Sequence, residues 1–263
     1  MSITYVYPKL PAAGYTFPVV RFSGSGLANC LFVYARAIKY SYVNNVKLLT
    51  PAWFNISIGP YLRRQKDKRH YFGLFNGKGE IGGVRKIFIL LLKRKKVKIV
   101  KGLGSYFEDI LEDSPIVCSY IERQVDQLLV KLKSFDFNNC VAVHVRLGDY
   151  PDNVRTPIQW YIEQIKYMQE RNSNYRFLLF SDGNDDELKN ILIIPSVQRG
   201  FFGSAIADIF AISKCCYLIG SDSTFSGWGA YLGQVPCIFF QKHYGPVLID
   251  QSKEIVVNDQ KLW

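Results

Sequence analysis

The alternation of strand and helix patterns predicts an α/β protein built of two Rossmann-like domains that face each other across a cleft. Three observations predict it: a strand, glycine loop, helix and strand in the first fifty residues, regular alternation after residue 135, and polar clusters where the strands end. The 263 residues, 48% of them hydrophobic, suffice for two domains of ordinary size. We expect an N-terminal α/β domain over 1–135 and a C-terminal Rossmann-like domain over 136–263, divided at the polar stretch Ser134–Cys140.

The N-terminal domain opens with a βαβ pattern. "FPVVRF" at Phe17–Phe22 is typical of a strand, and the glycines of "SGSGLAN" interrupt it. Apolar residues from Leu27 to Tyr42 then recur at helical spacing, and Val46–Thr50 is a second strand. Further on, an amphipathic pattern predicts a helix with Ser114 as its N-cap and Pro115 in its first turn.

The formal charge of +11 is concentrated in one segment. Between Tyr61 and Lys101 there are fourteen Lys and Arg against two acids, Asp67 and Glu80, so this segment carries +12 and the rest 11 − 12 = −1. Nucleic acid, an anionic membrane surface or a phosphate-bearing substrate would each match it, and so would a solvated surface without a partner. Within it, Val84–Lys101 is either a helix lying in a membrane interface or a buried helix followed by a strand at Val97–Val100.

The C-terminal domain shows the regular alternation of a doubly wound parallel sheet. Helices are expected at 158–171, at 204–215 and after "SDSTFS". The expected strands are 141–145, 175–181, 191–195, 216–220 and 235–240. Because ligands of such sheets bind at the carboxyl ends of the strands, the residues that follow each strand are the candidates for a site.

Polar clusters follow these strands: "HVRLGD", "SDGNDD" and "SDSTFS", with "SGSG" in the first domain. Arg146 ends a buried strand, where its guanidinium can hold a phosphate through two hydrogen bonds, or can pair with Asp149 as a structural clip. Ser221, Ser223 and Thr224 precede an apolar helix, where hydroxyls and free amides bind an anion or simply cap the helix.

Several common sites are absent from the sequence. The glycine loop lacks the G-x-G-x-x-G fingerprint, and there is no P-loop, no G-x-S-x-G and no C-x-x-C pair. No D-x-D pair occurs, so we expect no metal, and a bound diphosphate must be neutralised by cationic side chains and backbone amides. We also expect no resident cofactor.

Four stretches carry a family resemblance. "HVRLGDY" resembles the H-x-R-R-G-D-Y motif of the α1,2-fucosyltransferase family, and "SGSGLANCLFVYARA" resembles its opening G-G-L-G-N-Q-x-F-Q-Y-A. "FLLFSDGND" is similar to its F-x-x-F-S-D strand end, and "ADIFAISKCCYLIGSDSTFSGWGAYL" to its D-L-x-L-M-S…N-S-T-F-S-W-W-G-A-W-L stretch. The motifs occur in the family's order and cover most of the chain outside Pro51–Ser134.

The resemblance implies a GT-B-like fold and an inverting, metal-independent transfer of fucose from GDP-fucose to a glycan hydroxyl. It implies that Arg146 holds the donor β-phosphate. The acceptor hydroxyl must also lose a proton to a general base, for which Asp149 and Asp182 are the candidates. We count Arg146 and Asp149 as catalytic. The residues implied to bind the donor are His144 and Asp208 on guanine, Ser223, Thr224 and Phe225 on phosphate, Gly26 and Asn29 near the sugar, and Arg146 and Asp182.

The chain departs from the family pattern near the expected sugar site. Leu147 replaces the second arginine of the motif, and further departures are Ala28, Cys30, Val33 and Gly227. A different nucleotide-sugar donor on the same fold is therefore one alternative. A second alternative is a nucleic-acid-binding protein that uses the basic segment 61–101, although no nucleic acid is expected as a partner of the enzyme.

The cellular setting follows from the N-terminus and the charge. Family enzymes of secretory compartments carry an N-terminal membrane anchor, whereas "MSITYVYPKLPAAGY" has no apolar signal region. The resemblance therefore implies a cytoplasmic enzyme of bacterial-type or viral surface polysaccharide synthesis. The N-terminal domain is expected to take the acceptor, a glycan that includes the lipid-linked kind. Its basic segment is expected to hold the enzyme peripherally on the anionic inner face of a membrane.

Overall fold

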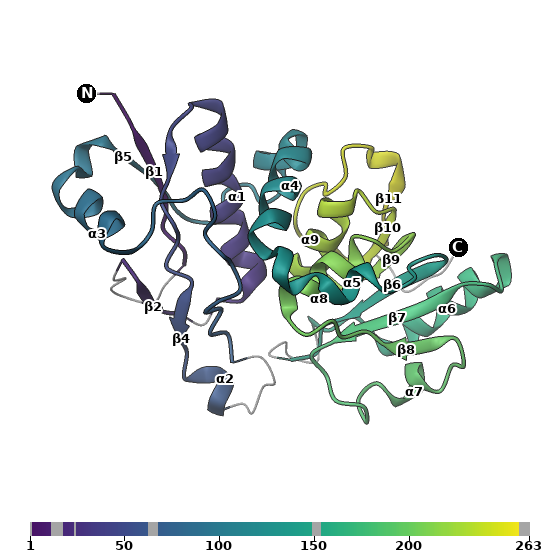
Figure 1. Ribbon diagram of the computed structural model, residues 1–263. Coiled ribbons are helices and arrows are strands. Elements are labelled where there is room, and N and C mark those ends of the chain that lie inside the picture. Colours follow the sequence, from purple (N-terminus) through teal and green to yellow (C-terminus); the bar gives the residue numbers. More distant parts are fainter. Residues whose placement is uncertain (1, 12–17, 24, 63–67, 149–153, 258–263) are drawn as a thin grey trace. The chain divides into compact units, whose positions relative to one another are not determined.

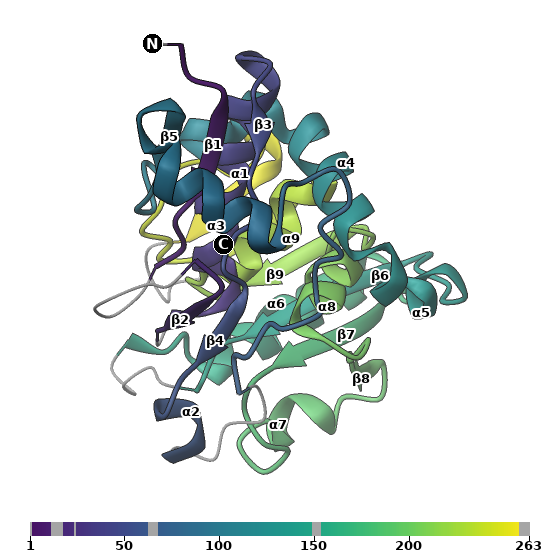
Figure 2. The same cartoon turned by 60° about the vertical axis from the view of Figure 1, so that its left-hand side comes forward.

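The computed structural model describes residues 2–11, 18–23, 25–62, 68–148 and 154–257. The chain divides into two compact units, Met1–Gln127 and Leu128–Trp263, each an α/β structure (Figures 1 and 2). The division falls at residue 127, where the sequence had suggested 135.

The N-terminal unit is built on a three-stranded parallel sheet in the order β3-β1-β5. Its strands are β1 (Tyr5–Pro8), β3 (Lys47–Leu48) and β5 (Val97–Val100). Helix α1 (Leu27–Val43) lies on one face of this sheet and α3 (Gly83–Leu92) on the other (Figures 1 and 2). The side chains that join α3 to the sheet are Ile89, Val97, Tyr7 and Leu49.

The predicted opening βαβ unit is wrong in its first strand. Val20–Phe22 forms β2, which pairs in parallel with β4 (Phe54–Ile56) in a separate two-stranded sheet. The strand that α1 connects to β3 is β1, which was not predicted as a strand. Pro8 lies beyond Tyr5 and Val6, the two residues of β1 that pair with β3. Its missing N–H therefore costs no hydrogen bond between β1 and β3. Residues 12–17 lie outside the described part of the chain.

Helix α4 (Ser114–Val125) confirms the amphipathic helix, with small differences at both ends. Asp113 is the N-cap and Ser114 the first helical residue, with Pro115 in the first turn as expected. After Val125 the chain continues in a 3-10 turn and the short α5 (Val130–Lys133). The remaining elements of the N-terminal unit are α2 (Gly59–Leu62) and 3-10 turns at Arg94–Lys96 and Glu108–Asp113.

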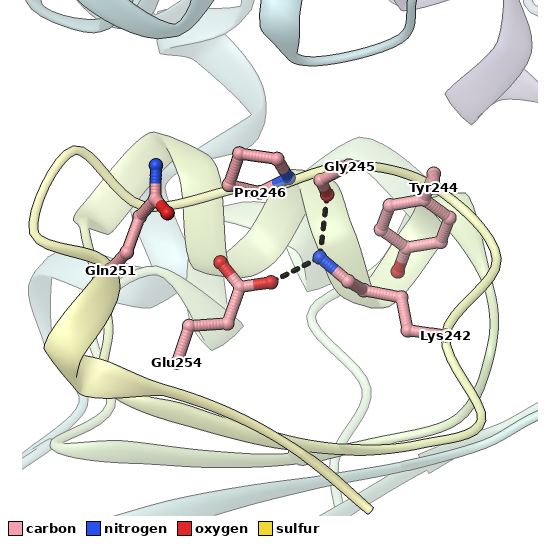
Figure 3. Close-up of a pocket in the computed structure, with 6 residues that line it drawn as sticks. All are labelled: Lys242, Tyr244, Gly245, Pro246, Gln251 and Glu254. Atoms are coloured by element: carbon pink, nitrogen blue, oxygen red, sulfur yellow. Dashed lines mark hydrogen bonds and ion pairs between the residues drawn. The ribbon is translucent and has the colours of Figure 1, made fainter. Parts of the chain in front are cut away.

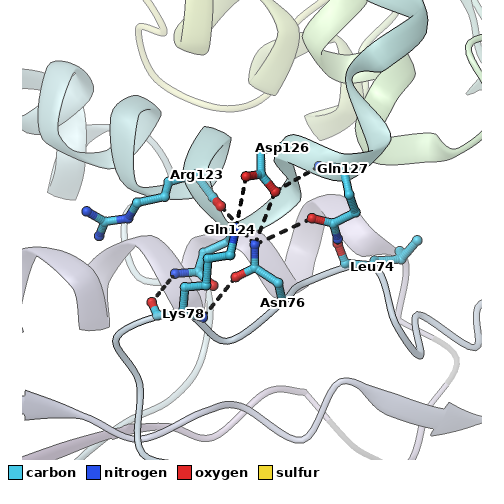
Figure 4. Close-up of polar contacts among 7 residues, drawn as sticks. All are labelled: Leu74, Asn76, Lys78, Arg123, Gln124, Asp126 and Gln127. Atoms are coloured by element: carbon cyan, nitrogen blue, oxygen red, sulfur yellow. Dashed lines mark hydrogen bonds and ion pairs between the residues drawn. The ribbon is translucent and has the colours of Figure 1, made fainter.

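The loop before α3 is fastened to the end of α4 (Figure 4). The backbone N–H of Asn76 donates to the carbonyl of Gln124 at 2.8 Å, and its side-chain amide donates to the carbonyl of Arg123 at 3.0 Å. These contacts satisfy carbonyls that the helix end leaves without intrahelical partners. Lys78 pairs with Asp126 at 3.0 Å, so this lysine of the basic segment serves the fold.

The C-terminal unit is a doubly wound, six-stranded parallel sheet in the order β11-β10-β9-β6-β7-β8, as predicted in type. Its strands are β6 (Cys140–Val145), β7 (Arg176–Ser181), β8 (Val197–Arg199), β9 (Tyr217–Gly220), β10 (Cys237–Phe240) and β11 (Glu254–Val257). Val141, Val143 and Val145 of β6 share one hydrophobic cluster with residues of α6 (Ile158–Arg171) and α7 (Lys189–Leu192). Helices α8 (Ala205–Ile212) and α9 (Thr224–Gly233) cover the opposite face (Figure 1).

Two strands differ from the sequence prediction. The apolar run 191–195 is not a strand: Ile191 and Leu192 end α7, and β8 follows at Val197–Arg199. A short apolar run fits a buried helical turn as well as a strand, so periodicity could not separate them. Strand β11 was missed, because it is four residues long and follows β10 without a crossover helix.

Helices α8 and α9 approach closely at Gly229. A Cβ built on this glycine would lie 2.3 Å from Cγ2 of Ile212, on the neighbouring helix. We therefore expect Gly229→Ala to lower the free energy of unfolding by about 1–3 kcal/mol, measured by urea denaturation. The double variant with Ile212→Ala should be less destabilised than the sum of the single changes, and strict additivity would contradict this account.

Within the described residues, no helix is both long and apolar enough to cross a membrane.

Candidate functional site

The carboxyl ends of β6 and β9 form the switch point of the C-terminal sheet. From β6 the chain continues to β7 and β8 on one side, whereas β9, β10 and β11 lie on the other. His144 pairs with Gly220, and the backbone N–H of Ser221 donates to the carbonyl of His144 at 3.1 Å. The two polar clusters "HVRLGD" and "SDSTFS" therefore begin side by side, where doubly wound sheets bind their ligands.

His144 is buried at this point, with 5% of its surface exposed. Its Nδ1 lies 2.6 Å from Oγ of Ser226 and 3.1 Å from Oγ of Ser221, and its ring stacks on Phe225 at 4.8 Å between centroids. Burial lowers the pKa of His144 to about 3, and the attraction of Asp182 only partly opposes it. The imidazole is therefore neutral near pH 7, and its predicted contact with guanine stays a prediction.

Arg146 and Asp182 form an ion pair above the ends of β6 and β7. Nη1 of Arg146 lies 2.6 Å from Oδ2 of Asp182, while Oδ1 of Asp182 accepts a hydrogen bond from the N–H of Leu147 at 2.9 Å. A Cβ on Gly148 would come within 2.1 Å of the same carboxylate, so a larger residue here would have to displace the Asp182 side chain. Asp182 thus orients the guanidinium, and its two oxygens are already engaged as the structure stands.

The sequence had offered Asp149 as the partner of Arg146, but residues 149–153 lie outside the described part of the chain. The role of Asp149 as a catalytic base stays a prediction. Leu147, the departure from the family motif, is 5% exposed and belongs to the hydrophobic cluster beneath the sheet. Its replacement of an arginine is thus part of the packing of this unit and gives no sign of the transferred sugar.

The first turn of α9 supplies the second part of the site. Oγ of Ser223 accepts a hydrogen bond from the N–H of Phe225 at 3.3 Å, so Ser223 is the N-cap of this ten-residue helix. Thr224 is the first helical residue and is half-buried. The positive end of the helix dipole at this turn favours an anion.

A loop after β10 fixes the backbone around this helix start. The hydroxyl of Tyr244 donates to the carbonyl of Ser223 at 2.8 Å, and Nδ1 of His243 lies 2.6 Å from each carboxylate oxygen of Asp222. Sequence reasoning missed these contacts, because the partners are 21 residues apart and no motif joins them. Ser226 was missed as well, although it stands three residues after the predicted Ser223.

Asp208 lies in the first turn of α8, at a distance in sequence from the other residues. Oδ1 of Asp208 accepts a hydrogen bond from the N–H of Phe202 at 2.7 Å. Burial raises the pKa of its carboxyl to about 7, and that hydrogen bond opposes the rise. A half-buried carboxylate with this pKa can change its protonation near neutral pH, as functional groups often do.

Gly26 and Asn29 belong to the N-terminal unit, whereas the other described candidates belong to the C-terminal unit. Gly26 is the N-cap of α1 in an extended conformation, and a Cβ built on it meets no atom within 4 Å. Asn29 stands in the first turn of α1 and is half-buried. Their predicted proximity to a donor sugar stays a prediction.

A separate pocket lies beside the loop after β10 (Figure 3). Its centre is the ion pair of Lys242 and Glu254, whose side chains are 4% and 6% exposed. Oε2 of Glu254 accepts a hydrogen bond from the N–H of Val247 at 2.8 Å. The charged groups of this pocket are already paired with each other. Their ion pair holds the connection between β10 and β11 in place.

Removing one partner of this ion pair should be costly. We expect Lys242→Met to lower the free energy of unfolding by about 3 kcal/mol, because Glu254 stays buried without its counter-charge. Urea denaturation followed by circular dichroism measures the effect. Lys253→Met is the control, since Lys253 pairs with Asp250 on the same loop but is exposed. An equal loss in both variants would contradict the role of the buried pair.

The arrangement in the C-terminal unit suits a phosphate-bearing ligand. Arg146 provides a planar cation held by Asp182, and the start of α9 provides backbone amides. In the described residues no group of three or more His, Cys, Asp or Glu is placed to hold a metal ion.

A family model for glycosyl transferase family 11 matches residues 107–241 of this chain. The matched segment is just over half of the protein and contains all of the switch-point residues. The chain belongs to glycosyl transferase family 11. The predicted family resemblance is thereby confirmed.

The relatives agree with the family. The chain is 34% identical over 105 residues to the Escherichia coli protein named α-1,2-colitosyltransferase, and the match covers 36% of each of the two chains. It is 29% identical over 107 residues to the E. coli O-antigen biosynthesis glycosyltransferase WbnK, which covers 36% of this chain and 34% of that one. These matches span about a third of the length of each relative.

A crystal structure of the fucosyltransferase NodZ from Bradyrhizobium is similar in fold, with a TM-score of 0.50 and 11% identity. The similarity covers 92% of this chain and 96% of NodZ. With the two α/β units and their parallel sheets, this confirms the α/β, GT-B-like fold class.

Proposed function

We propose that this protein is an inverting, metal-independent glycosyltransferase that moves fucose from GDP-fucose to a glycan hydroxyl in surface polysaccharide synthesis. The observation that carries the proposal is the Arg146–Asp182 pair beside the start of α9, at the switch point of a family 11 sheet. The relatives named for O-antigen biosynthesis and colitose transfer support the polysaccharide setting.

The chemistry requires that the bond between the sugar and the diphosphate breaks, which builds negative charge on the leaving group. A guanidinium held in place and backbone amides stabilise that charge more in the transition state than in the bound donor. Because His144 is neutral, it adds no positive charge to this edge. The absence of a D-x-D pair supports a reaction in which Arg146 and the start of α9 do the work of a metal.

The acceptor hydroxyl must lose its proton as it attacks the sugar from the face opposite the diphosphate, and this attack inverts the anomeric centre. We assign the base to Asp149, since Asp182 is engaged by Arg146 and by the amide of Leu147. The N-terminal unit, with Gly26 and Asn29 at the start of α1, is proposed to take the acceptor and the transferred sugar.

The transferred sugar has one alternative with a specific observation behind it. The relative with 34% identity is named for colitose. A donor screen that includes nucleotide-linked fucose and nucleotide-linked colitose separates the two. The role of Arg146 is the same with either sugar.

Thermal shift in the presence of EDTA tests the donor class. At a hundredfold excess over its dissociation constant, GDP should stabilise the protein by about 2.7 kcal/mol, which raises the Tm by about 5 °C or more. UDP should give a smaller shift. Stabilisation by a random oligonucleotide without any by GDP would overturn the enzyme and favour a nucleic-acid-binding protein.

A further inference from the structure

Helix α3 has an apolar face that no other described element covers. The four residues of this face are 53–82% exposed: Val84 82%, Phe88 53%, Leu91 70% and Leu92 70%. Their spacing of four, three and one residues places them on one side of the helix. Ile89, on the other side, is 2% exposed and joins the helix to the sheet. The helix is therefore anchored by one face and presents a second hydrophobic face outward.

Cations surround this apolar face. Arg85 is exposed beside Val84, and four consecutive exposed cations, Lys93–Lys96, follow the helix. No acidic residue occurs between Glu80 and Glu108. The last three of these cations form a 3-10 turn that continues directly from α3, so the charges stay next to the apolar side chains. We call Val84, Phe88, Leu91 and Leu92 with Arg85 and Lys93–Lys96 the α3 face.

We propose that the α3 face docks on an anionic lipid bilayer. The apolar side chains would enter the boundary between headgroups and acyl chains, while the cations contact the lipid phosphates. Ten helical residues are about 15 Å long, half of what is needed to cross the hydrocarbon core, so the helix lies in the plane of the surface. The sheet behind α3 fixes its orientation before the membrane is met.

Charge complementarity decides for lipid over other occupants. A second copy of the chain would bring five cations against five cations, without an acid to offset them. The cations could bind the phosphates of a nucleic acid. Nucleic-acid binding would not explain why four aliphatic and aromatic side chains are exposed on one helical face. An anionic membrane surface matches both features at once. The proposal goes beyond the sugar transfer and does not depend on it.

Flotation with lipid vesicles tests the proposal on the full chain without a sugar donor. Vesicles of phosphatidylcholine alone are compared with vesicles in which about a third of the lipid is phosphatidylglycerol. We expect the protein to float only with the anionic vesicles. Lys93→Gln with Arg94→Gln and Lys95→Gln should weaken binding about a hundredfold, since each cation near such a surface contributes about fivefold. Phe88→Ser with Leu91→Ser should weaken it about tenfold or more.

Matched controls change the same features elsewhere. The control for charge is Lys166→Gln with Lys189→Gln and Lys214→Gln, three exposed lysines of the C-terminal unit. The control for exposed apolar area is Ile193→Ser with Phe201→Ser, which are 68% and 71% exposed. Both should keep the binding of the unchanged protein. The urea unfolding transition of each variant, followed by circular dichroism, reports that its fold is intact.

Four results would overturn the proposal. One is the absence of flotation with anionic vesicles, and another is an equal loss of binding in the charge control. A third is unchanged vesicle binding by the Phe88 and Leu91 variant, because the surface would then be a general cation patch that also suits nucleic acid. The fourth is a dimer in sedimentation velocity that dissociates in that same variant. None of these results bears on the sugar-transfer assay.

Discussion

Replacing Arg146 with alanine should lower kcat for sugar transfer by about a hundred- to a thousandfold, with little change in the unfolding transition. The guanidinium is aimed by Asp182, so it meets the diphosphate without reorganisation as charge develops. Its side chain is partly exposed, so the fold does not depend on it as a buried ion would. Arg146→Lys should recover only part of the rate, because an ammonium keeps the charge but loses the two-pronged geometry.

Steady-state kinetics with purified variants measures this effect. Arg176→Ala is the control: this arginine pairs with Asp136 at the amino end of β7, away from the switch point. It should leave kcat unchanged. A fully active Arg146→Ala variant would contradict the assignment of Arg146 to the site.

Asp208→Asn should weaken GDP binding by about tenfold or more and at the same time make the protein more stable at pH 8. The pKa of this carboxyl is raised to about 7 by burial, so above pH 7 the fold carries a buried charge. Asparagine keeps the oxygen that accepts from the N–H of Phe202, but removes the charge that the resemblance assigns to guanine. The gain in unfolding free energy at pH 8 should be at least about 1 kcal/mol.

The sign of the pH dependence follows from the raised pKa. Between the unfolded value of 3.8 and about 7, the folded protein holds a proton that the unfolded chain releases. The stability from this site is thus full in acid and falls as the pH rises through about 7. GDP affinity should show the opposite trend, weakening as the pH falls below 7, because the protonated carboxyl accepts poorly.

Urea denaturation at pH 5 and pH 8, with calorimetric titration of GDP at both, measures these trends. Asp136→Asn is the control, since the side chain of Asp136 is 62% exposed. If the Asp208→Asn variant binds GDP as tightly as the unchanged protein, Asp208 is not part of the donor site. This holds whatever the stability of the variant.

The position of the site could be predicted because parallel strands end at one edge of a sheet. Arg146 follows β6 and Ser223 follows β9, and the hydrophobic runs that end there were visible without a structure. The ion pair of Arg146 with Asp182 was not predicted, since it joins residues 36 apart through the pairing of β6 with β7. Sequence proximity favoured Asp149 instead.

Other differences have similar causes. Strands β1 and β11 were not predicted, and each is only four residues long. The sequence left open whether Val84–Lys101 begins with a buried or an interfacial helix, and in the structure only part of the apolar side of α3 faces the sheet. An amphipathic pattern shows that a helix has two faces, but only the tertiary structure shows how much of the apolar face the sheet covers.

The most direct test of sugar transfer by this chain is proton NMR of GDP-fucose incubated with the protein in EDTA. With water as acceptor, we expect release of GDP and, at the first time points, of fucose with the anomeric configuration inverted relative to the donor. Retained configuration, or turnover that appears only when a divalent metal is added, would contradict it.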